Sequence, residues 1–448
     1  MKKRFLTCLL ACLLCPALAL GESLVTYGGQ FTEYHSGYRD FLAEHPGFSL
    51  DWPPNVYYST AELTTALMTG AYSCDVLYLF ADTFDLPRMM DKGYLLDLSG
   101  SDILTEAVSR MYPSIARHVM RDGKLCALPD HVGFSYWRIC RDVWEQVGLT
   151  DADVPQSFLE FLDFLDAWCD RIEDEPVEGV RVHGETGMTE TELLRWLTGL
   201  LMDEAIMQMQ YAGEPLHFDQ EELPGLLERC EQVAKRLAVL ERNSGPYELI
   251  EHSGGRSDWP RQPGDVLWLR LSDEQPKLMK TSLNVWAVYV GTEKPELAIE
   301  LLEKSVQGSW DERYDELYLY QGEEPTIDGD YEENKAWGEA KLSEVMARLQ
   351  EGPLTPDVRD ELEKDRAEYE RWLKNVEQWK WVMSAEQMAD YQQAAAGLFI
   401  PGPDVFVGTG NLSVRWNLMD RFAAHQLNVR QFLWELHQAA LMIRMENE

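Results

Sequence analysis

The stretch that decides the fold runs from residue 121 to residue 169 and reads RDGKLCALPDHVGFSYWRICRDVWEQVGLTDADVPQSFLEFLDFLDAWC. Asp122 and Gly123 supply a turn that accepts positive φ angles. Pro129 has no N–H to donate to a sheet, so it is predicted to end a strand over 124–128. The chain is therefore expected to change direction sharply at this proline.

Three more elements follow in quick succession. A second run of strand formers covers 132–137, and a short amphipathic helix begins at Arg141 and ends at Gly148. Ser157 and Glu160 have the spacing of a capping box, which satisfies the free N–H groups at the start of a helix. The expected apolar face of that helix consists of Phe158, Phe161, Leu162, Leu165 and Trp168.

This order of motifs resembles the extracellular solute-binding proteins of ABC importers, family 1. The family pattern reads DGKxYxLP, an apolar strand, YNkdlfxkxGl and then PxTWxEf. Here the corresponding segments read DGKLCALP at 122–129, CRDVWEQVGL at 140–149 and PQSFLEF at 155–161. Cys126 and Cys140 stand where the family often has Tyr and usually has Asn, so the contacts of those two positions are not carried over.

The resemblance implies an α/β fold with two lobes, of the periplasmic-binding-protein-like type 2, with hinge crossings near Pro129 and Lys280 and a helical C-terminal extension. It also implies a cleft between the lobes that closes on a ligand by hinge motion. The length of 448 residues agrees with two lobes plus elaboration. The expected division is a signal peptide at 1–19, an N-terminal lobe at 20–129 and 281–330, and a C-terminal lobe at 130–280 and 331–448.

The N-terminus has the composition of a signal peptide. Lys2, Lys3 and Arg4 precede an apolar run and a small-residue cleavage site at 17–19. We therefore expect an exported protein, extracellular or held in the cell envelope. Cys15 is a candidate for lipid attachment, although large residues precede it where small ones are usual, so plain cleavage is preferred.

The rest of the chain follows a clear local pattern. Strands and helices alternate from Leu24 to Phe80, which favours a largely parallel sheet. From about Asp330 to Met383 the chain is acidic and helical, and an amphipathic helix packed on its own lobe is preferred to a partner-binding coiled coil. Asn428 is expected to cap a final helix.

Charge and cysteine content exclude several classes of protein. The formal net charge of −37 repels phosphate backbones, so no nucleic-acid partner is expected. The five cysteines beyond the leader show neither C-x-x-C pairs nor zinc-like spacing. They are interpreted as buried free thiols: Cys74, Cys126, Cys140, Cys169 and Cys230.

The sequence contains no H-E-x-x-H, G-x-S-x-G or Walker A motif. With 77 acidic residues, carboxylate pairs occur by chance and do not indicate a glycosidase. We therefore predict a protein that is not an enzyme, with no catalytic residues, cofactor or metal.

Sugar binding needs flat aromatic faces and planar polar groups. Ligands of α/β sheets bind beyond the carboxyl ends of strands, which makes Tyr27 and Asp82 candidates on the first lobe. Trp259 is the preferred candidate on the second lobe, because a Trp among Gly, Ser, Asp and Pro has little reason to be buried. The remaining candidates are His131, Trp137 and Trp286, of which the two tryptophans are also read as packing residues in apolar strands.

The predicted function is capture of a sugar or oligosaccharide and its delivery to the transmembrane subunits of an ABC permease, by a monomer. A binder of peptides, polyamines or other cationic solutes is the first alternative, since the surface is acidic. A secreted glycan hydrolase and a sensory or adhesive module are alternatives of other classes. The identity of the ligand, the permease and the mode of anchoring stay open.

Overall fold

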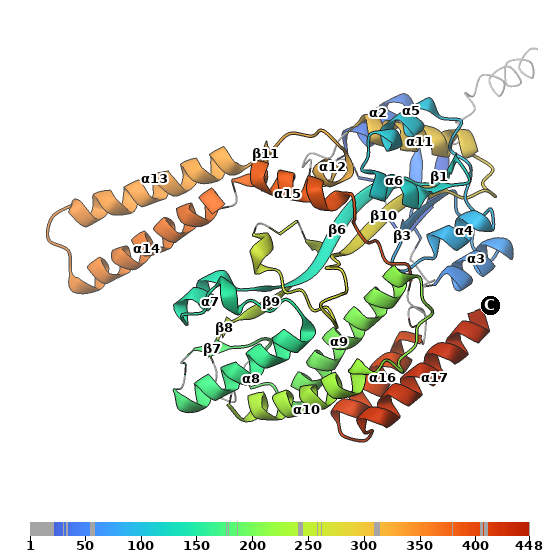
Figure 1. Ribbon diagram of the computed structural model, residues 1–448. Coiled ribbons are helices and arrows are strands. Elements are labelled where there is room, and N and C mark those ends of the chain that lie inside the picture. Colours follow the sequence, from blue (N-terminus) through green and yellow to red (C-terminus); the bar gives the residue numbers. More distant parts are fainter. Residues whose placement is uncertain are drawn as a thin grey trace, which may run out of the picture. The chain divides into compact units, whose positions relative to one another are not determined.

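A mixed six-stranded sheet with the order β2-β1-β3-β10-β6-β9 forms the centre of the computed structural model (Figure 1). β1 pairs in parallel with β2 and β3, whereas β10 pairs antiparallel with β3 and β6, and β6 pairs antiparallel with β9. The strands are β1 (Ser23–Tyr27), β2 (Ser49–Asp51), β3 (Val76–Phe80), β6 (Leu128–Ile139), β9 (Ile250–Ser257) and β10 (Lys280–Val288). The structure describes residues 22–29, 31–32, 35–53, 59–175, 177, 179–185, 187–240, 245–257, 259–260, 262–308, 314–378, 380–403, 406 and 411–447.

The chain divides into two compact units by its internal contacts. The first unit comprises Met1–Asp311 with Gly397–Glu448, and the second comprises Glu312–Ala396. The predicted boundary between 330 and 331 lies inside the second unit, and the assignment of segments to lobes stays a prediction. The predicted signal peptide and Cys15 lie outside the described residues.

One group of helices of the first unit lies around the parallel part of the sheet (Figure 1). Ser59 accepts a hydrogen bond from the N–H of Glu62 at the start of α3, as the sequence predicts. Gly28, with φ of 85°, lies so close to Tyr78 that an added Cβ would be 2.0 Å from its carbonyl oxygen. The helices are α2 (Ser36–Glu44), α3 (Thr60–Met68), α4 (Leu86–Asp91), α5 (Asp102–Ser109), α6 (Pro113–Val119) and α11 (Pro295–Gln307).

The turn at Asp122 and Gly123 is confirmed, with φ of 52° and 80°. It joins the short strands β4 (Met120–Arg121) and β5 (Lys124–Leu125). The prediction that Pro129 ends a strand is wrong, because Pro129 is the second residue of β6. The register of β6 on β10 shifts just beyond it, so the proline sits at an irregularity of the ladder, where a missing N–H is tolerated.

The predicted helix pair after β6 is also present. α7 (Arg141–Gln146) is followed by Gly148 in the left-handed region, with φ of 75°. Ser157 accepts a hydrogen bond from the N–H of Glu160 at the start of α8 (Phe158–Asp174). The Glu160 carboxylate, however, accepts from the N–H of Gln156 at 2.7 Å, one residue earlier than the capping box requires.

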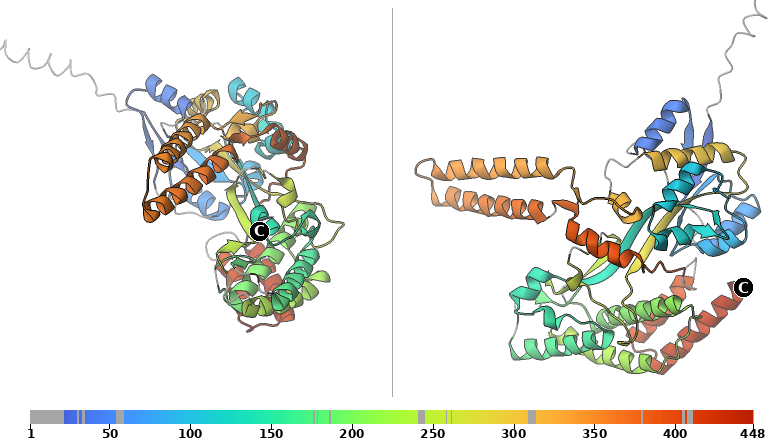
Figure 2. Two further views of the ribbon diagram at one scale, coloured as in Figure 1. Left: turned by 90° about the vertical axis from the view of Figure 1, so that its left-hand side faces the viewer. Right: turned by 45° about the horizontal axis from the view of Figure 1, so that its top comes forward.

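A second group of helices packs at the other end of β6 and β10 (Figure 2). Phe158 and Phe161 of α8 are fully buried there, and each such side chain contributes about 1.5–3 kcal/mol by burial. The group consists of α8, α9 (Glu190–Ala212), α10 (Glu222–Leu240), α16 (Asn411–Ala423) and α17 (Val429–Asn447). Asn428 caps α17 through Gln431, as predicted. The sheet and the two helix groups joined by β6 and β10 confirm the predicted fold class.

The smaller elements of the first unit are few. The strands β7 (Val180–Arg181) and β8 (Tyr247–Glu248) pair in parallel, and 3-10 turns cover Asp151–Asp153 and Pro263–Asp265. The five predicted thiols are free: Cys74, Cys126, Cys169 and Cys230 are buried, and Cys140 is half-buried. None of the helices in the described part of the chain combines the length and the apolar character needed to cross a bilayer.

The second unit consists largely of a helical hairpin, in which α13 (Tyr331–Gln350) and α14 (Pro356–Gln378) lie side by side (Figure 2). At Gly338 the helices approach closely, since an added Cβ would lie 2.8 Å from side-chain atoms of Trp372 and Leu373. The remaining elements are α12 (Tyr314–Leu319), β11 (Thr326–Ile327), β12 (Trp381–Met383) and α15 (Ala385–Ala395). The predicted acidic helical region is thus a two-helix hairpin.

Candidate functional site

A cavity of about 270 Å³ lies within the first unit. Its walls come from the chain beyond β3, the middle of β6, one face of α9, His252 of β9, the segment 266–279, the start of β10, the chain at 401–402 and α16. The cavity therefore combines α9 and α16 of the second helix group with Asp82 and Thr83, which follow β3 in the parallel part of the sheet. Its volume is close to the lower end of the roughly 300–1,000 Å³ found for small-molecule sites.

Two tryptophans provide aromatic surface at the cavity. Trp137 of β6 is half-buried, and its ring centroid lies 4.8 Å from those of His183 and His252. Trp268 is also half-buried, and the Lys277 ammonium lies 5.5 Å from its ring centroid. Both side chains therefore retain exposed ring area that can contact the C–H face of a ligand.

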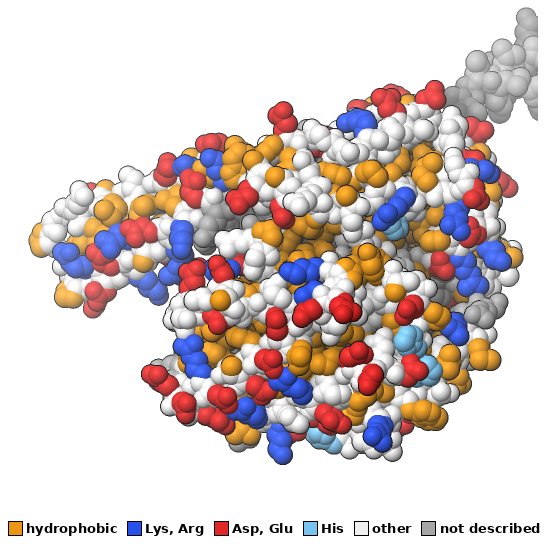
Figure 3. All heavy atoms as spheres, viewed as in Figure 1, with side chains coloured by type: hydrophobic (Ala, Val, Ile, Leu, Met, Phe, Trp, Pro, Cys, Tyr) orange, Lys and Arg blue, Asp and Glu red, His pale blue; other side chains and the backbone are white. Residues whose placement is uncertain are grey.

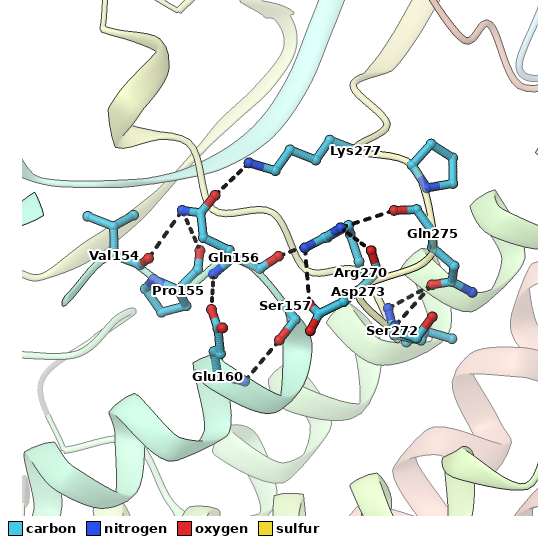
Figure 4. Close-up of polar contacts among 12 residues, drawn as sticks. Val154, Pro155, Gln156, Ser157, Glu160, Arg270, Ser272, Asp273, Gln275 and Lys277 are labelled. Atoms are coloured by element: carbon cyan, nitrogen blue, oxygen red, sulfur yellow. Dashed lines mark hydrogen bonds and ion pairs between the residues drawn. The ribbon is translucent and has the colours of Figure 1, made fainter. Parts of the chain in front are cut away.

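Figure 4 shows how the segment 266–279 is attached to the start of α8. Arg270 Nε donates to the carbonyl of Gln156 at 3.0 Å, and Arg270 Nη1 donates to the carbonyl of Asp273 at 2.8 Å. Lys277 Nζ donates to Gln156 Oε1 at 2.6 Å. These contacts occupy the guanidinium of Arg270, so this residue holds the cavity wall in place instead of offering a free positive charge.

The segment is also fixed from within. Gln275 Oε1 accepts hydrogen bonds from the N–H of Leu271 at 2.9 Å and of Ser272 at 3.3 Å (Figure 4). The carbonyl of Gln275 accepts a further bond from Arg270 Nη1 at 3.2 Å. A chain without regular secondary structure thus obtains partners for its backbone groups, as a partly buried loop must.

Two carboxylates of α9 also line the cavity. Asp203 forms an ion pair with Arg415 of α16, and the Arg415 side chain is 6% exposed. Glu204 is buried, and burial raises its pKa to about 7, with the charge of Asp203 adding to the rise and the hydrogen bond from Gln208 opposing it. The cavity therefore contains one carboxyl group that titrates near neutral pH.

Two histidines beside Trp137 are held in their neutral form. Burial lowers the pKa of His183 and of His252 below the usual value of 6.5. His252 Nε2 lies 3.1 Å from the Ser135 hydroxyl on the neighbouring strand. The aromatic wall around Trp137 is thus uncharged at neutral pH, which suits a polar but uncharged ligand.

The structure brings two of the six predicted site residues to the cavity, namely Asp82 and Trp137. His131 lies on β6 opposite Asn284 and does not line it. Tyr27 is 1% exposed and packs edge-on against Tyr72 and Phe84. Whether any of the six residues binds a ligand stays a prediction.

The expectation that Trp259 is not a core residue is wrong. Its side chain is 5% exposed, and its ring meets that of Phe134 edge to face at 5.1 Å. The polar residues that surround Trp259 in the sequence say little about its place in the fold. Trp286 is buried as well and stacks on Phe31 at 4.3 Å, in agreement with its alternative reading as a packing residue.

Several cavity residues were missed from the sequence. Asp203 and Glu204 carried a usable signal, because a pair of acids interrupts the otherwise apolar run from Leu200 to Met207 in α9. Trp268 lies in the apolar sequence VLWL and gave no signal. Arg415 and Arg270 reach the site only through tertiary contacts.

No group of metal-ligating side chains occurs among the residues with described positions.

Figure 3 shows Asp and Glu side chains spread over the face in view, with Lys and Arg among them. The acidic character of the chain is therefore general on this face and is not gathered at one patch.

No family model matches the sequence, and no curated protein sequence matches it either. Among solved structures, an ABC transporter solute-binding protein from Agrobacterium vitis S4 with bound D-mannitol is 16% identical, with a TM-score of 0.47 over 95% of this chain and 98% of that one. An ABC substrate-binding protein from Listeria monocytogenes in complex with cycloalternan is 11% identical, with a TM-score of 0.49 over 95% and 99%. Maltose-bound MalE3 of T. maritima is 13% identical, with a TM-score of 0.47 over 94% and 99%. The ligands named are properties of those proteins.

Proposed function

We propose that this chain is the extracellular solute-binding component of an ABC importer and that it captures a sugar or oligosaccharide in the cavity without altering it. The observation that carries the proposal is the combination of two half-buried tryptophans, Trp137 and Trp268, with polar side chains in one cavity, which is lined by the second helix group and by the chain beyond β3. Aromatic faces and a few placed polar groups are what a pyranose ring needs once water is expelled.

The polar groups that line the cavity support a neutral polyhydroxylated solute. Gln210 and Ser135 offer uncharged donors and acceptors. Arg415 is paired with Asp203, and Arg270 is occupied by carbonyl groups and by Asp273, so neither is free to select an anion. The remaining charged residues of the lining, Lys280 and Asp82, have opposite signs. Export, a permease partner and a monomeric state belong to the same proposal, with lipid attachment through Cys15 as the alternative to plain cleavage.

A thermal-shift screen tests the proposal directly. The panel consists of glucose, mannitol, maltose, maltotriose and xylobiose, with spermidine and a tripeptide as tests of the cationic and peptide alternatives. A solute present at 100 times its Kd stabilises the native protein by about 2.7 kcal/mol, so the melting temperature rises for a sugar that binds. The Trp137→Ala variant is expected to lose most of this rise, because it removes an aromatic face of the cavity.

The matched control is Trp434→Ala, because Trp434 is 64% exposed on α17 and does not line the cavity. This variant is expected to keep the full response to sugar. Flat melting curves for every sugar with a response to spermidine would support the cationic alternative. Release of a cleaved product from maltotriose would instead support a hydrolase.

A further inference from the structure

One face of α9 forms a wall of the cavity and carries an unusual carboxyl group. Leu200, Asp203, Glu204 and Met207 recur at helical spacing and all line the cavity. Glu204 is 8% exposed, although its neighbour Asp203 has a side chain that is 57% exposed. Glu204 is therefore enclosed by protein while still facing the cavity.

The contacts of Glu204 fix one of its two oxygens. Gln208 Nε2 donates to Glu204 Oε1 at 2.7 Å and also donates to the carbonyl of Pro276 at 3.1 Å. The Pro276 contact settles the orientation of the amide, because a carbonyl oxygen accepts only from Nε2, so the same nitrogen donates to Glu204. Within the described residues no protein donor contacts Glu204 Oε2, which leaves this oxygen for a group in the cavity.

The surrounding charges favour the neutral acid. Asp203, one residue away on α9, repels a second negative charge, and the cation nearest to Asp203 is Arg415, which pairs with it. Arg270 favours the ionised form of Glu204, but its effect is smaller than those of burial, Gln208 and Asp203. The other titratable groups that line the cavity are Asp82, Tyr136, His252 and Lys280. No ion pair links Glu204 to a cation in the described part of the chain, so its ionised form would be a poorly compensated buried charge.

We infer that Glu204 is a specificity-determining residue of the cavity, which donates a hydrogen bond from its carboxylic acid to an acceptor oxygen of the bound solute. The inference rests on the proposed capture of a sugar, whose hydroxyl and ring oxygens are suitable acceptors. The rise of the Glu204 pKa to about 7 supports it, because the acid then keeps its proton at mildly acidic pH.

A dependence of affinity on pH follows. If only the protonated form binds well, the apparent Kd increases as the protonated fraction falls. With a pKa of about 7 the protonated fraction drops about tenfold from pH 6 to pH 8. Affinity for a sugar is thus expected to weaken about tenfold over this range.

The test is isothermal titration calorimetry of the full-length protein with glucose, mannitol, maltose, maltotriose and xylobiose at pH 6, 7 and 8. The Glu204→Gln variant is expected to bind with nearly constant affinity, because an amide donates at every pH. Glu204→Leu is expected to bind about tenfold or more weakly at pH 6, because an acceptor oxygen of the sugar loses its donor. Should Glu204→Leu fail to fold, Glu204→Gln carries the test alone.

The control is His252→Gln, because His252 is another titratable group of the cavity and burial keeps its pKa below 6.5. This variant is expected to retain the loss of affinity between pH 6 and pH 8. Equal wild-type affinity across the range, or an unchanged loss in Glu204→Gln, would overturn the role of Glu204 and leave the capture of sugar intact. If no sugar of the panel binds at any pH, the proposed function fails and this inference fails with it.

Discussion

The helices of this protein meet in two contrasting settings. In the first unit, α8 and α10 pack together within a group that also contains α9, α16 and α17, and their inner faces are buried. In the second unit, α13 and α14 pack mainly on each other. Leu362 is the single buried hydrophobic residue among the described side chains of α14. Trp337 and Trp372 of the hairpin remain 47% and 40% exposed. Helices with similar amphipathic patterns therefore bury very different amounts of apolar surface, depending on how many neighbouring helices cover them.

The largest expected difference concerns truncation of a buried aromatic side chain. Phe161 of α8 is fully buried, so Phe161→Ala is expected to lower the free energy of unfolding by about 3–5 kcal/mol. Leu159→Ala, on the same helix but at a side chain that is 47% exposed, is expected to cost less than about 1 kcal/mol. Urea denaturation followed by circular dichroism measures both. Equal losses would contradict the assignment of Phe161 to a buried face of α8 and of Leu159 to an exposed face.

Carboxylates of the two settings should respond to pH in opposite directions. The pKa of Glu204 is raised to about 7 by burial, above its value of 4.5 in an unfolded chain. Its contribution to stability is therefore full below pH 4.5 and is lost as pH rises to about 7, by up to about 3 kcal/mol in total. Glu204→Gln should remove this loss in thermal melts recorded from pH 4.5 to pH 8.

Glu377 of the hairpin provides the contrast. Hydrogen bonds from Lys335 and Tyr331 lower the pKa of this carboxylate, so its contribution is present at neutral pH and is lost as the solution is acidified through the lowered value. Glu377→Gln should therefore reduce stability at pH 7 and have little effect at low pH. If Glu204→Gln and Glu377→Gln both raise or both lower stability at pH 7, the causes assigned to the two pKa shifts are wrong.

Truncation in the hairpin should act locally. Leu362 of α14 is 2% exposed, and Leu362→Ala is expected to cost about 2 kcal/mol, the low end for a buried leucine, since few neighbours surround the cavity that it leaves. Hydrogen exchange should accelerate over 331–378 while amides of α8 and α9 keep their protection. Val358→Ala, one turn away at a 36% exposed side chain, serves as the control. Faster exchange throughout the protein would show that the hairpin and the first unit unfold together.

Local chemistry explains what could be predicted from the sequence. The turn at Asp122 and the cap at Ser157 depend on residues within a few positions, and both are present. The strand alternation and the fold class follow from similar short-range patterns and from the family resemblance.

The cavity could not be predicted in the same way. Arg270 contacts Gln156 across 114 positions of sequence, and no local pattern reports such a contact. Trp259 shows the complementary error: its polar sequence neighbours suggested exposure, whereas a strand more than a hundred residues earlier covers it through Phe134. A site formed by several distant segments becomes visible only when the segments are placed in space.

The smallest expected effect concerns an ion pair on the solvent-exposed surface between α8 and α10. Arg236 of α10 donates to Asp170 of α8 at 2.6 Å, and both side chains are accessible to solvent. Such exposed pairs contribute about 0.2–1 kcal/mol and are screened by salt. Arg236→Met is therefore expected to lower the free energy of unfolding within this range, and the loss should shrink in 1 M NaCl.

Lys235→Met is the matched control, because it removes the same charge from the neighbouring position of α10, where the side chain is exposed and forms no ion pair with a described residue. It should change stability less than Arg236→Met at low salt and equally at high salt. If both variants lose the same amount at low salt, the contacts between α8 and α10 act through general charge balance, and burial alone accounts for the contrast with the hairpin.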